Sequence, residues 1–178
     1  MSERVALIGL SGAGKTTVAP RVAALLACEW IDLDREIEAA AKSDVPSLIR
    51  EEGEPAFRAR EAAALRTALE EDLRPWLVVA CGAGALLLSE NRARLAARAV
   101  TVWLRVAPET AAQRLGAAPE GARPLLAGDA PKTRLRALWE SRRAGYEAAA
   151  TLVVDTDGRS PDEVADEVAA LVREAGWG

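Results

Sequence analysis

Short apolar runs alternate with longer helical patterns along the whole chain. Residues 5–8 form an apolar run that ends at a glycine, which is typical of a buried strand. Four further strand-like stretches follow, at residues 29–32, 76–80, 99–106 and 152–154. The spacing of apolar residues predicts helices at residues 15–27, 35–41, 46–52 and 55 to about 73, and helices are also expected to begin at Pro108 and Pro161.

Strands that alternate with helices predict an α/β fold in which a mostly parallel sheet is covered on both faces. Ligands bind such sheets beyond the carboxyl ends of the strands. Residues 116–132 combine Gly, Ala, Pro, Asp and Arg without a period, which predicts a mobile functional loop. The 178 residues contain no repeat or internal linker, so we expect one domain spanning residues 1–178.

Composition narrows the possible functions. The net charge of -4 argues against a general nucleic-acid binder, and the absence of His excludes imidazole chemistry. Cys28 and Cys81 fit no zinc spacing and are expected to be buried free thiols in a reducing compartment. The first residues do not resemble a signal peptide, and no apolar run of about 20 residues could cross a bilayer. We therefore expect a cytoplasmic protein with no membrane partner.

The strongest motif is a phosphate-binding loop. Residues 9–16 read Gly-Leu-Ser-Gly-Ala-Gly-Lys-Thr, a full match to G-x-x-x-x-G-K-[ST], between a predicted strand and a predicted helix. Glycines allow successive main-chain N–H groups to face phosphate oxygens, and the helix N-terminus adds positive potential. Lys15 supplies charge to the β- and γ-phosphates, and the Thr16 hydroxyl is suited to Mg²⁺. The motif indicates nucleotide binding but does not identify the phosphate acceptor.

A pair of carboxylates follows the second predicted strand. Asp32 and Asp34 are one residue apart, so in an extended segment they would point to opposite sides. One could then face a metal and the other an acceptor hydroxyl. An ordinary solvated loop remains the alternative.

Several arginines could bind anions. Arg58 and Glu61 share a helix face, although a plain surface ion pair is the simpler reading. Arg123 lies in the irregular loop, from which it could close over a transferring phosphate. Arg142 and Arg143 are neighbours on the next predicted helix, so the orientation of that helix decides which of them points inward.

Taken in order, these elements resemble shikimate kinase over nearly the whole chain. The loop at 9–16 is followed by Asp-Leu-Asp at 32–34, Gly-Glu at 53–54, Phe-Arg-x-x-Glu at 57–61 and Gly-Ala-Gly at 82–84. Arg-Pro-Leu-Leu at 123–126 and Arg-x-x-x-Tyr at 142–146 complete the series. The loop is shared by many families, whereas the later elements at these distances are far more selective.

The resemblance implies a three-layer P-loop kinase fold like that of nucleoside monophosphate kinases, with a five-stranded parallel sheet and a mobile lid near residues 116–132. It implies a monomer that uses ATP and Mg²⁺ to phosphorylate the 3-hydroxyl of shikimate. The catalytic residues would be Lys15, Asp34 and Arg123, with Thr16 and Asp32 at the metal. The implied ATP-binding residues are Gly12, Ala13, Gly14, Lys15, Thr16, Thr17, Arg114, Arg123 and Arg159. The implied shikimate-binding residues are Asp34, Arg58, Glu61, Gly82, Ala83, Gly84 and Arg142.

Two positions depart from the family pattern. Ala83 replaces the middle residue of a glycine triplet, and it would be strained by about 1 kcal/mol or more if that position required a positive φ. Ile49 stands where many members carry an aromatic residue. A kinase for another small acceptor, such as gluconate or a nucleotide, and an inactive nucleotide-binding module are the competing interpretations.

Overall fold

A five-stranded parallel sheet in the order β2–β3–β1–β4–β5 forms the centre of the protein. The computed structural model describes residues 4–116 and 131–176. Its strands are β1 (Arg4–Ile8), β2 (Glu29–Asp32), β3 (Leu77–Ala80), β4 (Val100–Arg105) and β5 (Leu152–Asp155). The five strands and their parallel arrangement confirm the predicted fold class.

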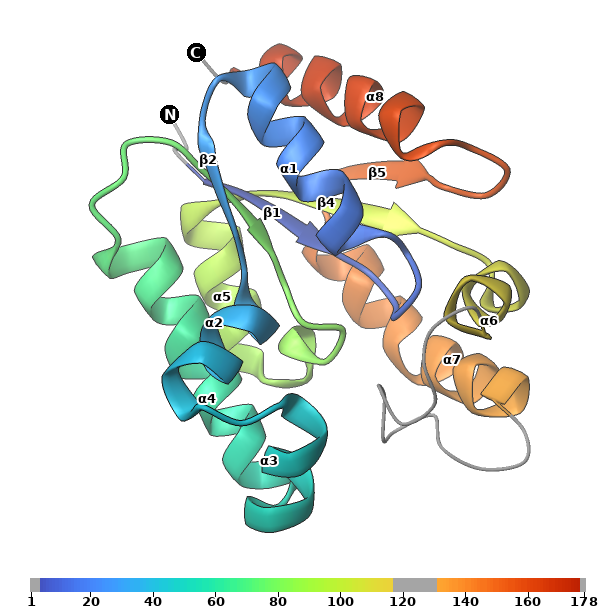
Figure 1. Cartoon of the computed structure of the whole chain (residues 1–178). Helices are drawn as coiled ribbons and strands as arrows, with labels where there is room; N and C mark the ends of the chain where they lie inside the picture. Colours follow the sequence, from blue (N-terminus) through green and yellow to red (C-terminus); the bar gives the residue numbers. More distant parts are fainter. Residues whose placement is uncertain (1–3, 117–130, 177–178) are drawn as a thin grey trace.

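Helices connect the strands and cover the sheet (Figure 1). They are α1 (Lys15–Leu26), α2 (Leu33–Ala41), α3 (Val45–Glu52), α4 (Glu54–Arg66), α5 (Ser89–Arg98), α6 (Pro108–Gly116), α7 (Pro131–Ala149) and α8 (Pro161–Glu174). A π-helical turn (Thr67–Glu71) extends α4, and a short 3₁₀ helix (Ala85–Leu87) follows β3. None of the helices among the described residues has the length and apolar character needed to span a membrane.

The alternation of side chains along β1 divides the core into two layers. Val5 and Leu7 pack with residues of α1 and α8 on one face of the sheet. Ala6 and Ile8 face the other side, where α4, α5 and α7 contribute the buried residues. Figure 1 shows this arrangement, with α1 and α8 on one side of the sheet and α4, α5 and α7 on the other. β1 is thus buried on both faces, and the loop that follows it is held on a rigid base.

Several boundaries differ from the predicted ones. The helix expected from residue 35 begins at Leu33, because the Asp32 side chain accepts hydrogen bonds from the N–H groups of Asp34 and Arg35 and caps the helix. The helix expected to reach residue 73 changes to a π turn after Arg66. Helix α5 was not predicted, since it is short and more than half polar or charged.

Two further predictions meet different outcomes. Cys81 is a buried free thiol, as expected, whereas Cys28 is only half-buried. The irregular stretch at residues 116–132 is bounded by the end of α6 and the start of α7. Residues 117–130, including Arg123, lie outside the described residues.

Candidate active site

Three glycines shape the loop between β1 and α1. Gly9, Gly12 and Gly14 have φ angles of 146°, 85° and 95°, which residues with a Cβ rarely adopt. A Cβ at Gly12 would also lie 2.8 Å from the main-chain oxygen of Ala111, so the loop packs directly against α6. The loop therefore curls tightly around the N-terminus of α1, where main-chain N–H groups favour an anion.

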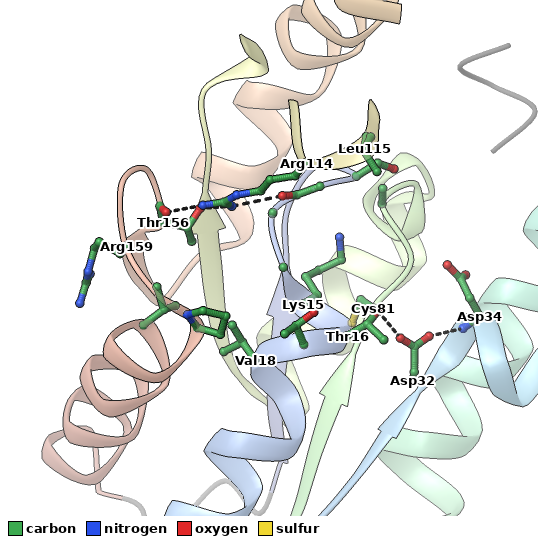
Figure 2. Close-up of a pocket in the computed structure, with 18 residues that line it drawn as sticks. Lys15, Thr16, Val18, Asp32, Asp34, Cys81, Arg114, Leu115, Thr156 and Arg159 are labelled. Carbon is green, nitrogen blue, oxygen red and sulfur yellow. Dashed lines mark hydrogen bonds between the residues drawn. The ribbon is translucent and has the colours of Figure 1, made fainter. Parts of the chain in front are cut away.

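Lys15 is the first residue of α1 and lies against this loop. Its Nζ donates hydrogen bonds to the main-chain oxygens of Gly9, at 2.8 Å, and Leu10, at 3.1 Å. Figure 2 shows the Lys15 side chain extending from the start of the helix along the loop. The full positive charge is thereby held at the mouth of the amide-lined loop, as phosphate binding requires.

A cavity of about 440 Å³ lies over the loop, and Arg114 of α6 forms part of its wall (Figure 2). The guanidinium of Arg114 donates to the main-chain oxygen of Gly12 at 3.2 Å, and to Oγ1 and the main-chain oxygen of Thr156 at 3.0 and 2.5 Å. Arg114 therefore ties the loop to the segment after β5. The cavity is also lined by the loop residues from Ser11 to Thr16 and by Thr17.

Arg159 lines the same cavity from the turn before α8. Its guanidinium donates to the main-chain oxygens of Asp155, at 3.0 Å, and Glu163, at 2.9 Å, and it forms an ion pair with Glu167. These contacts fix Arg159 to β5 and α8. The structure thus brings two of the arginines implied to bind ATP, Arg114 and Arg159, to the wall of one cavity.

Thr16, Asp32 and Asp34 form a row beside the loop. Thr16 Oγ1 donates to Asp32 Oδ2 at 2.6 Å, and the N–H of Asp34 donates to Asp32 Oδ1 at 3.0 Å (Figure 2). The prediction of an extended segment here was wrong, because β2 ends at Asp32 and Asp34 lies in the first turn of α2. The turn, rather than the alternation of a strand, separates the two carboxylates.

A second cavity, of about 280 Å³, adjoins the first. The two cavities share Ser11, Thr16, Asp32, Asp34 and Ala83 in their walls. Arg58 of α4 and Arg142 of α7 line the second cavity together with Asp34, and apolar side chains, among them Ile49, complete it. Arg35, Glu38 and Glu61 also line it, so this small space next to the phosphate-binding loop combines several guanidinium groups with several carboxylates.

Arg58 and Glu61 form a buried ion pair rather than the surface pair that simple helix spacing favours. The side chains are 11% and 1% exposed, and Arg58 Nη1 donates to Glu61 Oε2 at 2.8 Å. Burial raises the pKa of the Glu61 carboxyl, while Arg58 opposes that shift. Glu61 Oε1 is buried and has no hydrogen-bond partner among the described residues. An oxygen in this state is a ready acceptor for a hydroxyl donor.

The turn after β3 has glycine at two of its three positions, and a larger residue at either would displace a buried side chain. A Cβ at Gly82 would lie 2.1 Å from Glu61 Oε1, and a Cβ at Gly84 would lie 2.2 Å from Arg58 Nη1. Ala83 is not among the described residues with positive φ, so the strain considered for this alanine is absent. The main-chain oxygen of Ala83 accepts hydrogen bonds from Arg142 Nη1 at 3.1 Å and from Tyr146 Oη at 2.8 Å.

Sequence reasoning missed some residues that build the site. Ser11 lines both cavities, although the loop motif leaves its position unspecified. Thr156 is buried and holds Arg114, and its place just after β5 is a signal that could have found it, since sites gather at the carboxyl ends of strands. Leu138 of α7 lines the second cavity one turn before Arg142, a position that its helical spacing could have indicated.

Comparison with known proteins gives a consistent result. A family model described as shikimate kinase matches residues 11–173. The shikimate kinase of Symbiobacterium thermophilum is 39% identical over 97% of both chains, and that of Salinispora tropica is 43% identical over 93% of this chain and 95% of the relative. A structure of shikimate kinase from Acinetobacter baumannii in complex with shikimate superposes with a TM-score of 0.92 at 32% identity, covering 100% of this chain and 97% of the other. With a match of this extent in sequence and in fold, the chain belongs to the shikimate kinase family.

Proposed function

We propose that this member of the shikimate kinase family, an enzyme that phosphorylates shikimate with ATP, binds its two substrates in the two adjoining cavities. The larger cavity over the loop would take the nucleotide, and the smaller one would take shikimate. Both cavities have Asp34 and Thr16 in their walls, so the γ-phosphate and the acceptor hydroxyl would meet where they join. This contiguity supports direct transfer between the two substrates.

On the nucleotide side, charge neutralisation is the main task. The amides of Gly12, Ala13 and Gly14 and the start of α1 would surround the β-phosphate, with Thr16 and Thr17 following in the first turn. The Lys15 ammonium would exchange its carbonyl partners for phosphate oxygens. Arg114 and Arg159 also line this cavity, and the adenosine would lie beside them.

Thr16 and Asp32 fit a magnesium site. The hydroxyl and the carboxylate lie 2.6 Å apart at the edge of the nucleotide cavity, and both are hard oxygen donors of the kind that Mg²⁺ prefers. Mg²⁺ held there with phosphate oxygens and water would neutralise charge on the β- and γ-phosphates. Asp32 is also fixed by the amides of α2, so its orientation would not depend on the ligand.

On the acceptor side, Arg58 and Arg142 would bind the shikimate carboxylate, because planar guanidinium groups match carboxylate geometry. Asp34 and Oε1 of Glu61, which has no hydrogen-bond partner in the part of the chain that the structure describes, would accept hydrogen bonds from ring hydroxyls. Ala83 and Gly84 of the turn after β3 line this cavity, whereas Gly82 lines neither of the two cavities. The 280 Å³ of this cavity suits a small acid better than a nucleoside.

In the transfer step, Asp34 would orient the 3-hydroxyl and accept its proton. The hydroxyl oxygen forms a bond to the γ-phosphorus as the bond to the bridging β–γ oxygen breaks, giving ADP and shikimate 3-phosphate. Lys15 would stabilise charge on the moving phosphoryl group, and we propose the same role for Arg123.

The observation that carries this assignment is the convergence of Arg58, Arg142 and Asp34 on one cavity beside the loop. A coupled assay of ADP release with Mg²⁺ tests it, with shikimate, gluconate and a nucleoside monophosphate as separate acceptors. We expect ADP release only with shikimate. ADP release with only gluconate or only the nucleoside monophosphate would identify that compound as the acceptor instead of shikimate. ADP release with none of the three would favour an inactive nucleotide-binding module.

A further inference from the structure

Arg58 is held by a second carboxylate that does not belong to the acceptor cavity. Glu54, the first residue of α4, accepts hydrogen bonds through Oε1 from Arg58 Nη2 at 2.9 Å and from Nε at 3.3 Å. The Glu54 side chain is 45% exposed. Arg58 and Glu61 line the acceptor cavity, whereas Glu54 does not. Glu54 thus contacts Arg58 from outside the space that the acceptor would fill.

The guanidinium of Arg58 is confined on several sides. Arg58 Nε donates to Glu54, and Nη1 donates to Glu61. Gly84 packs so closely against the guanidinium that an added Cβ would lie 2.5 Å from Cζ. Of the five N–H donors of arginine, three are engaged by these two carboxylates. One N–H on each Nη has no partner among the described residues. These two donors are the ones available to a ligand in the cavity that Arg58 lines.

The position of Glu54 is itself fixed by the backbone. Gly53 ends α3 and precedes α4, with a φ of 87° that favours glycine, and its N–H donates to the main-chain oxygen of Ile49 at 3.0 Å. Glu54 lies one helical turn before Arg58, and its negative charge is favourable at a helix N-terminus. The carboxylate is therefore placed before any ligand binds.

We propose that Glu54 is a positioning residue for the acceptor: it fixes the guanidinium of Arg58 so that its remaining donors meet the acceptor carboxylate. The inference rests on the proposed role of Arg58. A long arginine side chain loses rotamer freedom when it binds a ligand, and a side chain that is already held loses less. Competition between Glu54 and an anionic ligand for the same cation would have the opposite effect, and tighter binding after removal of Glu54 would reveal it. The two effects change affinity in opposite directions, so measurement decides between them.

The test is a set of shikimate dissociation constants, measured by calorimetry on the full chain. Glu54→Ala should weaken shikimate binding about five- to tenfold, because the Arg58 side chain would then lose its freedom only when the ligand binds, and that loss would reduce the affinity. Glu54→Gln keeps an oxygen at the accepting position and should stay within about threefold of wild type. The matched control is Glu52→Ala, which removes a similar carboxylate from Arg60, an exposed arginine outside both cavities. This control should leave the shikimate affinity unchanged.

A double-mutant cycle separates positioning from a general effect on stability. In an Arg58→Ala background, Glu54→Ala should have no further effect on shikimate affinity, because it acts through Arg58. Tighter binding by Glu54→Ala, equal losses in Glu54→Gln and Glu54→Ala, or an undiminished effect without Arg58 would each overturn the proposal. If Arg58→Ala itself leaves shikimate affinity unchanged, the proposed role of Arg58 fails, which is a distinct result.

Discussion

Arg142 and Ala83 are joined by a hydrogen bond of 3.1 Å from Nη1 of the arginine to the main-chain oxygen of the alanine. Tyr146, one turn later on α7, donates to the same oxygen at 2.8 Å. The Tyr146 ring stacks on Trp103 of β4 with centroids 5.8 Å apart. Because one carbonyl accepts from both side chains, the turn after β3 and helix α7 are fixed to each other at the acceptor cavity.

This arrangement predicts a clear difference between two neighbouring arginines. Arg142→Ala should weaken shikimate binding about tenfold or more, since a charge-assisted hydrogen bond contributes about 1.5–3 kcal/mol, and it should leave ATP affinity nearly unchanged. Arg143→Ala is the matched control, because Arg143 is exposed and pairs only loosely with Glu147 at 3.7 Å. Calorimetric titration with each substrate measures both effects. Equal losses of the two affinities in Arg142→Ala would refute the assignment.

A second prediction concerns Lys15, whose ammonium lies at the mouth of the phosphate-binding loop. Lys15→Ala should reduce kcat roughly hundredfold or more, as expected when a preorganised group that stabilises transferring charge is removed. Lys42→Ala, at the exposed end of α2, serves as the control and should keep near-normal turnover. The coupled ADP assay at saturating shikimate is the measurement. Turnover close to wild type in Lys15→Ala would remove Lys15 from the mechanism.

The glycine turn gives a third prediction. Gly84→Ala would bring a Cβ to 2.2 Å from Arg58 Nη1, so the guanidinium must shift and shikimate affinity should fall about tenfold or more. Ala83→Gly creates no such clash and relieves no strained φ, so affinity should stay within about threefold. It should lower stability by roughly 0.5–1 kcal/mol through the added chain entropy. A large gain in affinity or activity in Ala83→Gly would show that the alanine methyl group presses on the acceptor.

The sequence predicts the scaffold of this protein better than the details of its site. Strands buried on both faces appear as continuous apolar runs, and the loop motif specifies its own backbone, so β1, the loop and α1 could be located directly. Helix α5 was missed because its short, polar sequence buries few side chains, Asn91 and Leu95 among them. Local pattern carries little information when tertiary contacts determine whether a segment is helical.

The site shows the same limit at the level of single residues. Spacing places Arg58 and Glu61 on one helix face but does not tell whether that face is buried, and burial makes this pair different from a surface ion pair. Likewise, the residue type at position 83 does not reveal its φ, which depends on how the turn packs against α4 and α7. The variants above test the proposed roles of the site residues.

A last prediction concerns stability and pH at the opposite end of the sheet. Asp72 Oδ1 accepts from Arg74 N and Nε, both at 2.9 Å, and Oδ2 accepts from Nη2 at 2.5 Å. Hydrogen bonds from the Arg74 side chain are the main reason that the pKa of Asp72 falls from 3.8 to about 2. A carboxyl group whose pKa is lowered by folding stabilises the folded state at pH values above its ordinary pKa of 3.8. That stabilisation is lost as the pH falls toward 2.

Asp72→Asn should therefore lower the free energy of unfolding by about 1 kcal/mol at pH 7, a value reduced for the partial exposure of the pair. The difference from wild type should narrow as pH falls below about 4. Urea unfolding at pH 7, 5 and 3 measures it, with Asp162→Asn as the control because Asp162 pairs with Arg21 in a highly exposed position. A difference that is the same at all three pH values would mean that packing, rather than the charge of Asp72, stabilises this corner.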